Sequence, residues 1–239
     1  VGAWWAVFTV PLLVFVHEPR GPAVSIAHAA LGGLSRLRKT LSEVRRLRVV
    51  MLFLAAYWLY IDGVDTVIVM AVDYGLSLGF DRKDLVGALL IVQFVGVPCA
   101  LGFGRLALLV GTKRAILSAL AVYLCVTVWA AFIEQKTEFY IMAVLIGSVQ
   151  GGVQALSRSF FARLIPDDKA AEFFGFYNMI GKFAAIVGPL AVGATALAAR
   201  ALGASAHVAP RFGIVSIAAL FLAGGILLAS VRENPGRRS

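Results

Sequence analysis

The sequence has few charged residues, few cysteines and few histidines. Asp, Glu, Lys and Arg make up 15% of its 239 residues, whereas soluble domains carry roughly 25%. Its two cysteines, Cys99 and Cys125, lie inside apolar runs, which is typical of small buried residues rather than of a disulfide framework. His17, His28 and His207 all fall between apolar runs. We therefore predict neither a disulfide framework nor a metal site.

Motifs of enzymes are also missing. The chain has no Gly-x-Ser-x-Gly, no His-Glu-x-x-His and no phosphate-binding glycine-rich loop, so we predict no enzyme, no cofactor and no self-contained ATP-driven pump. The net charge of +9 comes from basic residues in short connections between apolar runs. That distribution favours membrane orientation over nucleic-acid binding, and it makes membrane lipid the expected partner.

Long apolar runs fill most of the chain, which is 60% hydrophobic with a mean hydropathy of +0.88. A bilayer core needs roughly 20 residues of helix, and a lipid-exposed segment must satisfy its own backbone hydrogen bonds. The pattern predicts an all-α integral membrane protein. The expected apolar segments are about 1–16, 49–72, 85–103, 115–133, 139–161, 173–199 and 211–231.

The basic residues predict the orientation. Of the 22 Lys and Arg, sixteen lie in alternate connections and the C-terminal tail, five lie in the other connections, and Lys182 lies inside a span. The richer set is expected in the cytoplasm, which places the tail, residues 232–239, on that side. The high content of Ala, Gly, Arg and Val indicates a GC-rich bacterial genome and hence the inner (plasma) membrane.

The N-terminal region has two unusual parts. Segment 1–16 begins without Met and is short for a crossing, so we expect it to be the end of a span in a longer protein whose N-terminal half is missing. Connection 17–48 is basic with apolar residues at helical spacing. It is either an amphipathic helix on the cytoplasmic leaflet or a solvated linker helix.

Two acidic residues interrupt the second apolar segment. Asp62 and Asp65 lie three apart, and with Trp58 and Thr66 they are predicted to share one helix face. A carboxylate at bilayer depth costs about 2.5–3.5 kcal/mol on insertion scales, so this face must point at protein or water. It is either a site for a proton, a cation or a substrate amine, or half of a buried salt bridge.

A polar stripe follows the fifth segment. Gln150, Gln154 and Arg158 recur every fourth residue, and so lie along one side of a helix. The amides either bind a substrate or hold helices together, and the neighbouring Gly151-Gly152 allows close packing or local unwinding. Arg158, near the cytoplasmic end, is expected to be a gate or a loop anchor.

The sixth segment carries a charge inside an apolar stretch. Lys182 follows Tyr177 and Asn178, and it needs an acidic partner, for which the two aspartates of the second segment are candidates. Gly188-Pro189 predicts a kink, because proline removes a backbone donor and clashes with the preceding turn.

One connection resembles a transporter motif. Residues 104–114 are similar to the G-x-L-A-D-R-x-G-R-K-R loop of the major facilitator superfamily, although Leu108 and Leu109 stand at its charged centre. The matching residues are Gly104, Leu106, Ala107, Gly111, Lys113 and Arg114. The resemblance implies the C-terminal six-helix half of a twelve-helix fold, 49–231, preceded by part of helix 6 and by the linker 17–48.

Longer stretches resemble one branch of that superfamily. Residues 56–66 are similar to the A-Y-[FW]-L-Y-x-D-G-V-x-T stretch of the Atg22-like branch, named for a fungal vacuolar amino-acid effluxer. Residues 151–159, 172–177 and 181–189 look like the same branch. The resemblance implies alternating access and export, with amino acids as a candidate substrate class.

The leading hypothesis is a secondary transporter of small solutes, with proton coupling as a candidate drive and the substrate near the midplane. The aspartates would contact a proton or a substrate amine, the glutamines would donate hydrogen bonds, and Lys182 would be a counter-ion or carboxylate contact. Substrate or ion candidates are Trp58, Tyr60, Asp62, Asp65, Gln150, Gln154, Tyr177, Asn178 and Lys182. Gating candidates are Gly104, Gly111, Lys113, Arg114, Arg158, Gly188 and Pro189.

Two other classes remain open. A seven-helix receptor or retinal-type protein would suit the count of segments, but the last segment has no Lys for a Schiff base. A non-transporting membrane scaffold would use the polar residues only to join helices.

Overall fold

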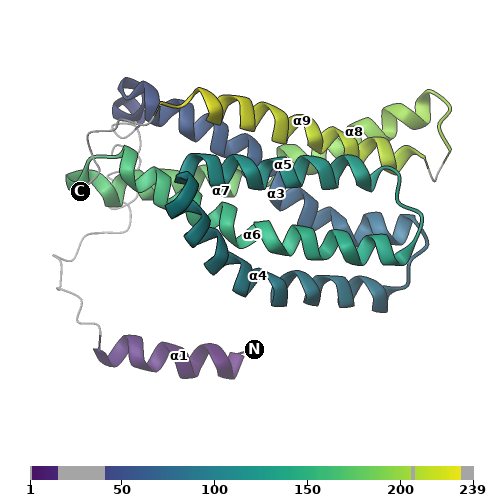
Figure 1. Ribbon diagram of the computed structural model, residues 1–239, viewed down its shortest axis with the longest axis horizontal. Coiled ribbons are helices and arrows are strands. Elements are labelled where there is room, and N and C mark those ends of the chain that lie inside the picture. Colours follow the sequence, from purple (N-terminus) through teal and green to yellow (C-terminus); the bar gives the residue numbers. More distant parts are fainter. Residues whose placement is uncertain (1, 16–40, 206–207, 233–239) are drawn as a thin grey trace, which may run out of the picture. The chain divides into compact units, whose positions relative to one another are not determined.

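The computed structural model describes residues 2–15, 41–205 and 208–232, and these are helical without strands (Figure 1). The helices are α1 (Gly2–Phe15), α3 (Arg48–Ser77), α4 (Arg82–Val110), α5 (Thr112–Ala130), α6 (Lys136–Leu164), η1 (Asp167–Lys169), α7 (Ala170–Ala184), α8 (Val187–Ala201) and α9 (Ala209–Ser230). Six helices are long and apolar enough to cross a membrane when α7 and α8 count as one, Ala170–Ala201. The predicted all-α membrane bundle of six spans is confirmed.

The chain divides into two units, Val1–Lys39 and Thr40–Ser239. In the first unit, α1 is apolar but only 14 residues long. Most of the predicted linker 17–48, namely residues 17–40, lies outside the described residues. Its last part belongs to the second unit, where residues 41–46 are helical. There the Lys169 ammonium donates to Glu43 Oε2 at 2.8 Å, and this hydrogen bond raises the pKa of Lys169.

Helix α3 lies at the centre of the second unit, where it packs against α9, α7, α6 and α8. Glycines allow the close contacts between these helices, as is common in membrane proteins. A Cβ on Gly224 of α9 would lie 2.9 Å from Tyr60 of α3, and one on Gly147 of α6 would lie 2.8 Å from the Val92 carbonyl of α4. Close packing and local unwinding were the two predicted roles of Gly151-Gly152. The structure shows close packing, since α6 is continuous there.

The turn between α4 and α5 is shorter than the predicted connection 104–114. Helix α4 continues to Val110 and α5 begins at Thr112, so only Gly111 is non-helical. Gly111 has φ +91°, a conformation that glycine adopts at little cost. The prediction that Gly104 lies in a loop is wrong, because it is inside α4. Glycine within a membrane helix is ordinary.

The predicted kink in the sixth span is a complete break. Helix α7 ends at Ala184 and α8 starts at Val187. Pro189 has no N–H to donate to the carbonyl of Ala185, and its ring crowds that carbonyl. The interruption therefore falls one turn before the proline rather than at Gly188-Pro189.

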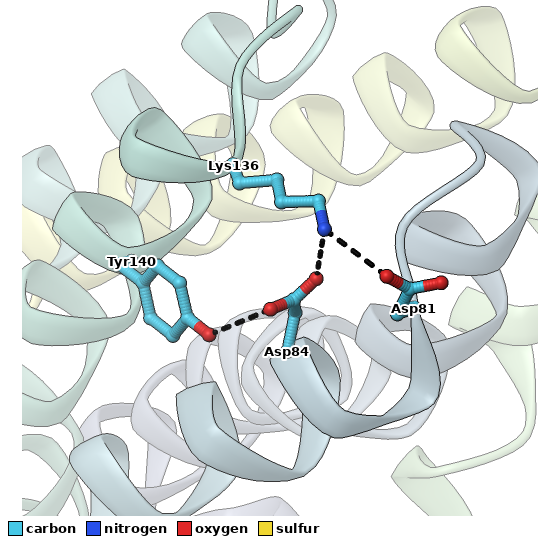
Figure 2. A network of polar contacts seen from close by, with 4 residues as sticks. All are labelled: Asp81, Asp84, Lys136 and Tyr140. Atoms are coloured by element: carbon cyan, nitrogen blue, oxygen red, sulfur yellow. Dashed lines mark hydrogen bonds and ion pairs between the residues drawn. The ribbon is translucent and has the colours of Figure 1, made fainter.

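Polar contacts join the helices at the end of the bundle where α3 and α5 finish (Figure 2). The Lys136 ammonium at the start of α6 lies 3.2 Å from Asp81 and 2.5 Å from Asp84. The Tyr140 hydroxyl donates to Asp84 Oδ1 at 3.2 Å. At the same end, Arg211 of α9 donates to the carbonyls of Ala131 and Ile133. These contacts fix the α3–α4 and α5–α6 connections to their neighbours.

Candidate functional site

An open cleft of about 790 Å³ lies between α3, α6 and α7. One side of each helix supplies it, since most of its lining residues recur three, four, seven or eight positions apart. The lining residues are Tyr57, Ile61, Asp65, Gly151, Gln154, Ala155, Arg158, Tyr177, Asn178, Gly181, Lys182 and Ala185. The structure thus brings together six of the predicted residues: Asp65, Gln154, Arg158, Tyr177, Asn178 and Lys182.

The polar groups of the cleft carry both signs of charge. Asp65 of α3 is half-buried, whereas Arg158 of α6 and Lys182 of α7 are exposed. Arg158 Nη2 donates to Asn178 Oδ1 at 3.2 Å, which orients the guanidinium across the α6–α7 side. Gln154 is also exposed beside them. A solute in this cleft would meet a carboxylate on one wall, cations on the other and amide groups between.

The predicted ion pair of Lys182 with Asp62 or Asp65 is not formed within the described part of the chain. Lys182 and Asp65 instead line the same cleft, and Asp62 points elsewhere. A charge enclosed in apolar surroundings needs an opposite charge, but Lys182 and Asp65 line an open cleft and do not need each other.

A stack of aromatic rings forms the wall behind the polar groups. The rings of Tyr57 and Tyr177 are stacked with centroids 4.2 Å apart, and Phe161 stacks on Tyr177 at 4.9 Å. Both tyrosines are almost fully buried. A Cβ on Gly181 would lie 3.2 Å from the Tyr57 hydroxyl, so the absence of a side chain at residue 181 leaves room for the Tyr57 ring.

Asp62 caps the broken helix. Its side chain is 1% exposed, and its Oδ1 accepts a hydrogen bond at 2.9 Å from the N–H of Gly188, the second residue of α8. Helix α8 has no side-chain cap of its own, so a carboxylate from α3 satisfies one of its free N–H groups and meets its positive end. A Cβ on Gly188 would collide with Thr66 and lie 3.1 Å from Asp62 Oδ1.

The predicted shared face of the second span lies on one continuous helix, but its four residues meet different surroundings. Asp65 faces the cleft, Asp62 and Thr66 are buried beside α8, and Trp58 is 40% exposed. Of the other predicted contacts, Tyr60 is fully buried with its hydroxyl 2.7 Å from Ser157 Oγ. Neither hydroxyl lines the cleft.

Four further predicted residues lie away from the cleft. Gln150 does not line it, and its Oε1 is buried without a hydrogen-bond partner among the described residues. Lys113 Nζ donates to the carbonyls of Ala229 and Val231 at 2.6 and 2.7 Å, which joins the start of α5 to the end of α9. Arg114 beside it is exposed, and Pro189 is half-buried in α8.

Sequence reasoning missed six lining residues, which are Tyr57, Ile61, Gly151, Ala155, Gly181 and Ala185. A signal for two of them was present, since Tyr57 and Ile61 precede Asp65 at intervals of four. The small residues gave no signal, because glycine and alanine also serve as packing residues.

Comparisons with known proteins give a consistent result. The family model described as "Vacuole effluxer Atg22 like" matches residues 1–239. The MFS-type transporter YxiO of Bacillus subtilis is 40% identical over 97% of this chain and 52% of that protein. Autophagy-related protein 22 of Coccidioides immitis is 26% identical over 97% of this chain and 42% of that protein. No solved structure matches.

The chain spans about half the length of the curated relatives it matches. The match to the family model covers it throughout, which agrees with the six apolar spans and with the absence of strands among the described residues. The chain is an integral membrane protein that belongs to the vacuole effluxer Atg22-like family of transporters.

Proposed function

We propose that the chain forms half of a secondary transporter that exports small zwitterionic solutes, with amino acids as the substrate class. The observation that carries this proposal is the placement of Asp65, Lys182 and Arg158 around one open cleft. An α-ammonium group suits the carboxylate, and an α-carboxylate suits the two cations. The family model that matches the chain is described as a vacuole effluxer, which supports export as the direction of transport.

The aromatic wall and the volume of the cleft are consistent with a small substrate. Tyr57 and Tyr177 are stacked and almost fully buried, so they hold the back wall of the cleft in a fixed position. The cleft of about 790 Å³ lies within the range of small-molecule sites. Alternating access would open and close it against the other half of the transporter.

Asp62 is proposed as the coupling residue rather than a substrate contact. It is buried against the start of α8, where protonation would remove the charge that meets the helix end. A change at Asp62 would then move the broken span, which also carries Lys182 and Asn178.

The test is the flux of labelled amino acids in vesicles that contain the full-length protein. Asp65→Asn and Lys182→Gln are each expected to lower apparent affinity roughly tenfold or more, since each removes a charged hydrogen-bonding partner. Asp73→Asn and Lys83→Gln are matched controls, because both positions are exposed and outside the cleft. Lys182→Gln should lower the apparent affinity for an amine that has no carboxylate less than it lowers the apparent affinity for an amino acid.

The outcomes separate the hypotheses. Unchanged flux in both cleft variants would remove the cleft from the transport path. No flux above empty vesicles for the wild type, with any amino acid, would favour the scaffold hypothesis.

A further inference from the structure

A second cavity, of about 1020 Å³, lies at the end of the bundle where α4 turns into α5 and where α9 ends. It shares no lining residue with the cleft. Its walls are the end of α4, the start of α5, the last turn of α6, and the end of α9 with the residues that follow it. This end carries the basic connections that the sequence places in the cytoplasm.

Three arginines from different parts of the chain line this cavity. Arg114 lies in the first turn of α5, Arg163 in the last turn of α6, and Arg232 two residues after the end of α9. All three are exposed, no acidic residue lines the described walls, and no ion pair there involves these arginines. The cavity therefore has positive charge that the described residues do not neutralise.

The backbone adds to that charge. Helix α5 has no side-chain cap at its start, so the N–H groups of its first turn remain available to an anion. Lys113 is already engaged, since its ammonium donates to two carbonyls of the α9 end. Those two hydrogen bonds hold α5 and α9 together and so fix the spacing between Arg114 and Arg232.

Two leucines make the cavity amphipathic. Leu108 and Leu109 line it and are 85% and 84% exposed. A free inorganic anion would gain nothing from them, whereas a lipid brings a headgroup and acyl chains together. Anionic lipids are enriched in the cytoplasmic leaflet, where each nearby basic side chain contributes attraction.

We propose that this cavity binds the phosphate headgroup of an anionic phospholipid. Arg114, Arg163 and Arg232 hold the phosphate, and Leu108 and Leu109 contact the acyl chains. The bound lipid joins the α4–α5 turn to the ends of α6 and α9. The proposal does not depend on the substrate of the cleft.

Native mass spectrometry of the full-length protein in detergent tests this assignment. The probes are phosphatidylglycerol, phosphatidylcholine and inorganic phosphate. The variant Arg114→Gln/Arg163→Gln/Arg232→Gln is expected to lose roughly a hundredfold in affinity for phosphatidylglycerol. The matched control Arg82→Gln/Lys83→Gln/Arg200→Gln removes three exposed charges outside the cavity and should bind like the wild type.

Three results would overturn the proposal. They are equal phosphatidylglycerol affinity in the triple variant and the wild type, equal affinity of the wild type for phosphatidylcholine, and inorganic phosphate that binds as tightly as the lipid and is lost in the same variant. The last result would assign a free-anion site. If the triple variant fails to fold, Arg163→Gln alone should cost roughly fivefold and Arg163→Lys less, and equal losses in both would contradict a charge-based site.

Discussion

Asp62 shows how one carboxylate can stabilise a helix that belongs to another span. It is buried and accepts a hydrogen bond from a backbone N–H of α8. Such a group is expensive to bury alone and favourable at a helix start. Its neighbour Asp65, three residues on, faces the open cleft instead. Two residues of the same type on one helix thus have different roles.

Asp62→Ala is expected to lower the free energy of unfolding by about 1–2 kcal/mol, since it leaves the N–H of Gly188 without an acceptor. Asp62→Asn should cost less, because its amide oxygen still accepts. Unfolding of the detergent-solubilised protein by denaturant measures both. Asp73→Ala, at an exposed position on the same helix, is the control. Equal stability of Asp62→Ala and the control would contradict a capping role.

Gly188→Ala is expected to destabilise the protein by about 1–3 kcal/mol through overpacking, because the new methyl group would collide with Thr66. Combining it with Thr66→Ala removes part of the obstruction, so the double variant should be more stable than the sum of the single changes predicts. A double-mutant cycle on the same unfolding assay measures this coupling. Strict additivity would show that the two side chains do not meet.

At the scale of the helices, the break between α7 and α8 depends on one proline. Pro189→Ala restores the N–H that the carbonyl of Ala185 lacks. We expect α7 and α8 to join, so that backbone amides at residues 186–190 exchange with deuterium more slowly. Flux should fall although the protein remains stable. Unchanged exchange at these amides would mean that Asp62, and not the proline, holds the break open.

The contact of α4 with α6 requires a small residue at 147. Gly147→Ala is expected to cost about 1–3 kcal/mol of stability, because its Cβ would lie 2.8 Å from a backbone carbonyl that cannot rotate away. Gly102→Ala is the matched control within α4, since nothing lies within 4 Å of its Cβ. There alanine should be neutral or stabilising through its helix propensity. A loss of similar size in both variants would rule out the specific contact.

The spans were predictable because bilayer thickness sets their length. Part of the cleft was predictable because the polar residues at 154, 158, 178 and 182 recur at helical spacing. The helix that Asp62 contacts was not predictable, since a helix that is apolar nearly all round does not reveal which side faces which neighbour. The extent of α4 was also missed, because the resemblance to a transporter loop placed residues 104–114 in a connection, whereas α4 continues to Val110 and a membrane helix tolerates Gly104.

For the whole molecule, the distribution of Lys and Arg predicts a fixed orientation. In a protein freed of Cys99 and Cys125, Glu134→Cys in the α5–α6 connection should react with a membrane-impermeant maleimide in intact cells. Asp168→Cys, in the α6–α7 connection, should react only after the cells are opened. Both positions are exposed. The reverse pattern would place the second cavity and its arginines outside the cell.

The contacts of Lys136 and Arg211 lie at one end of the bundle, whereas the cleft reaches towards the other, where Arg158 lies in the last two turns of α6. Helix α3 has 30 residues and is about 45 Å long. A tilt of about 5° around its fixed end would therefore carry its first turn about 4 Å sideways. Because α3 is stiff, it would act as a lever. A small rotation at its linked end would produce a displacement as wide as an atom at its open end.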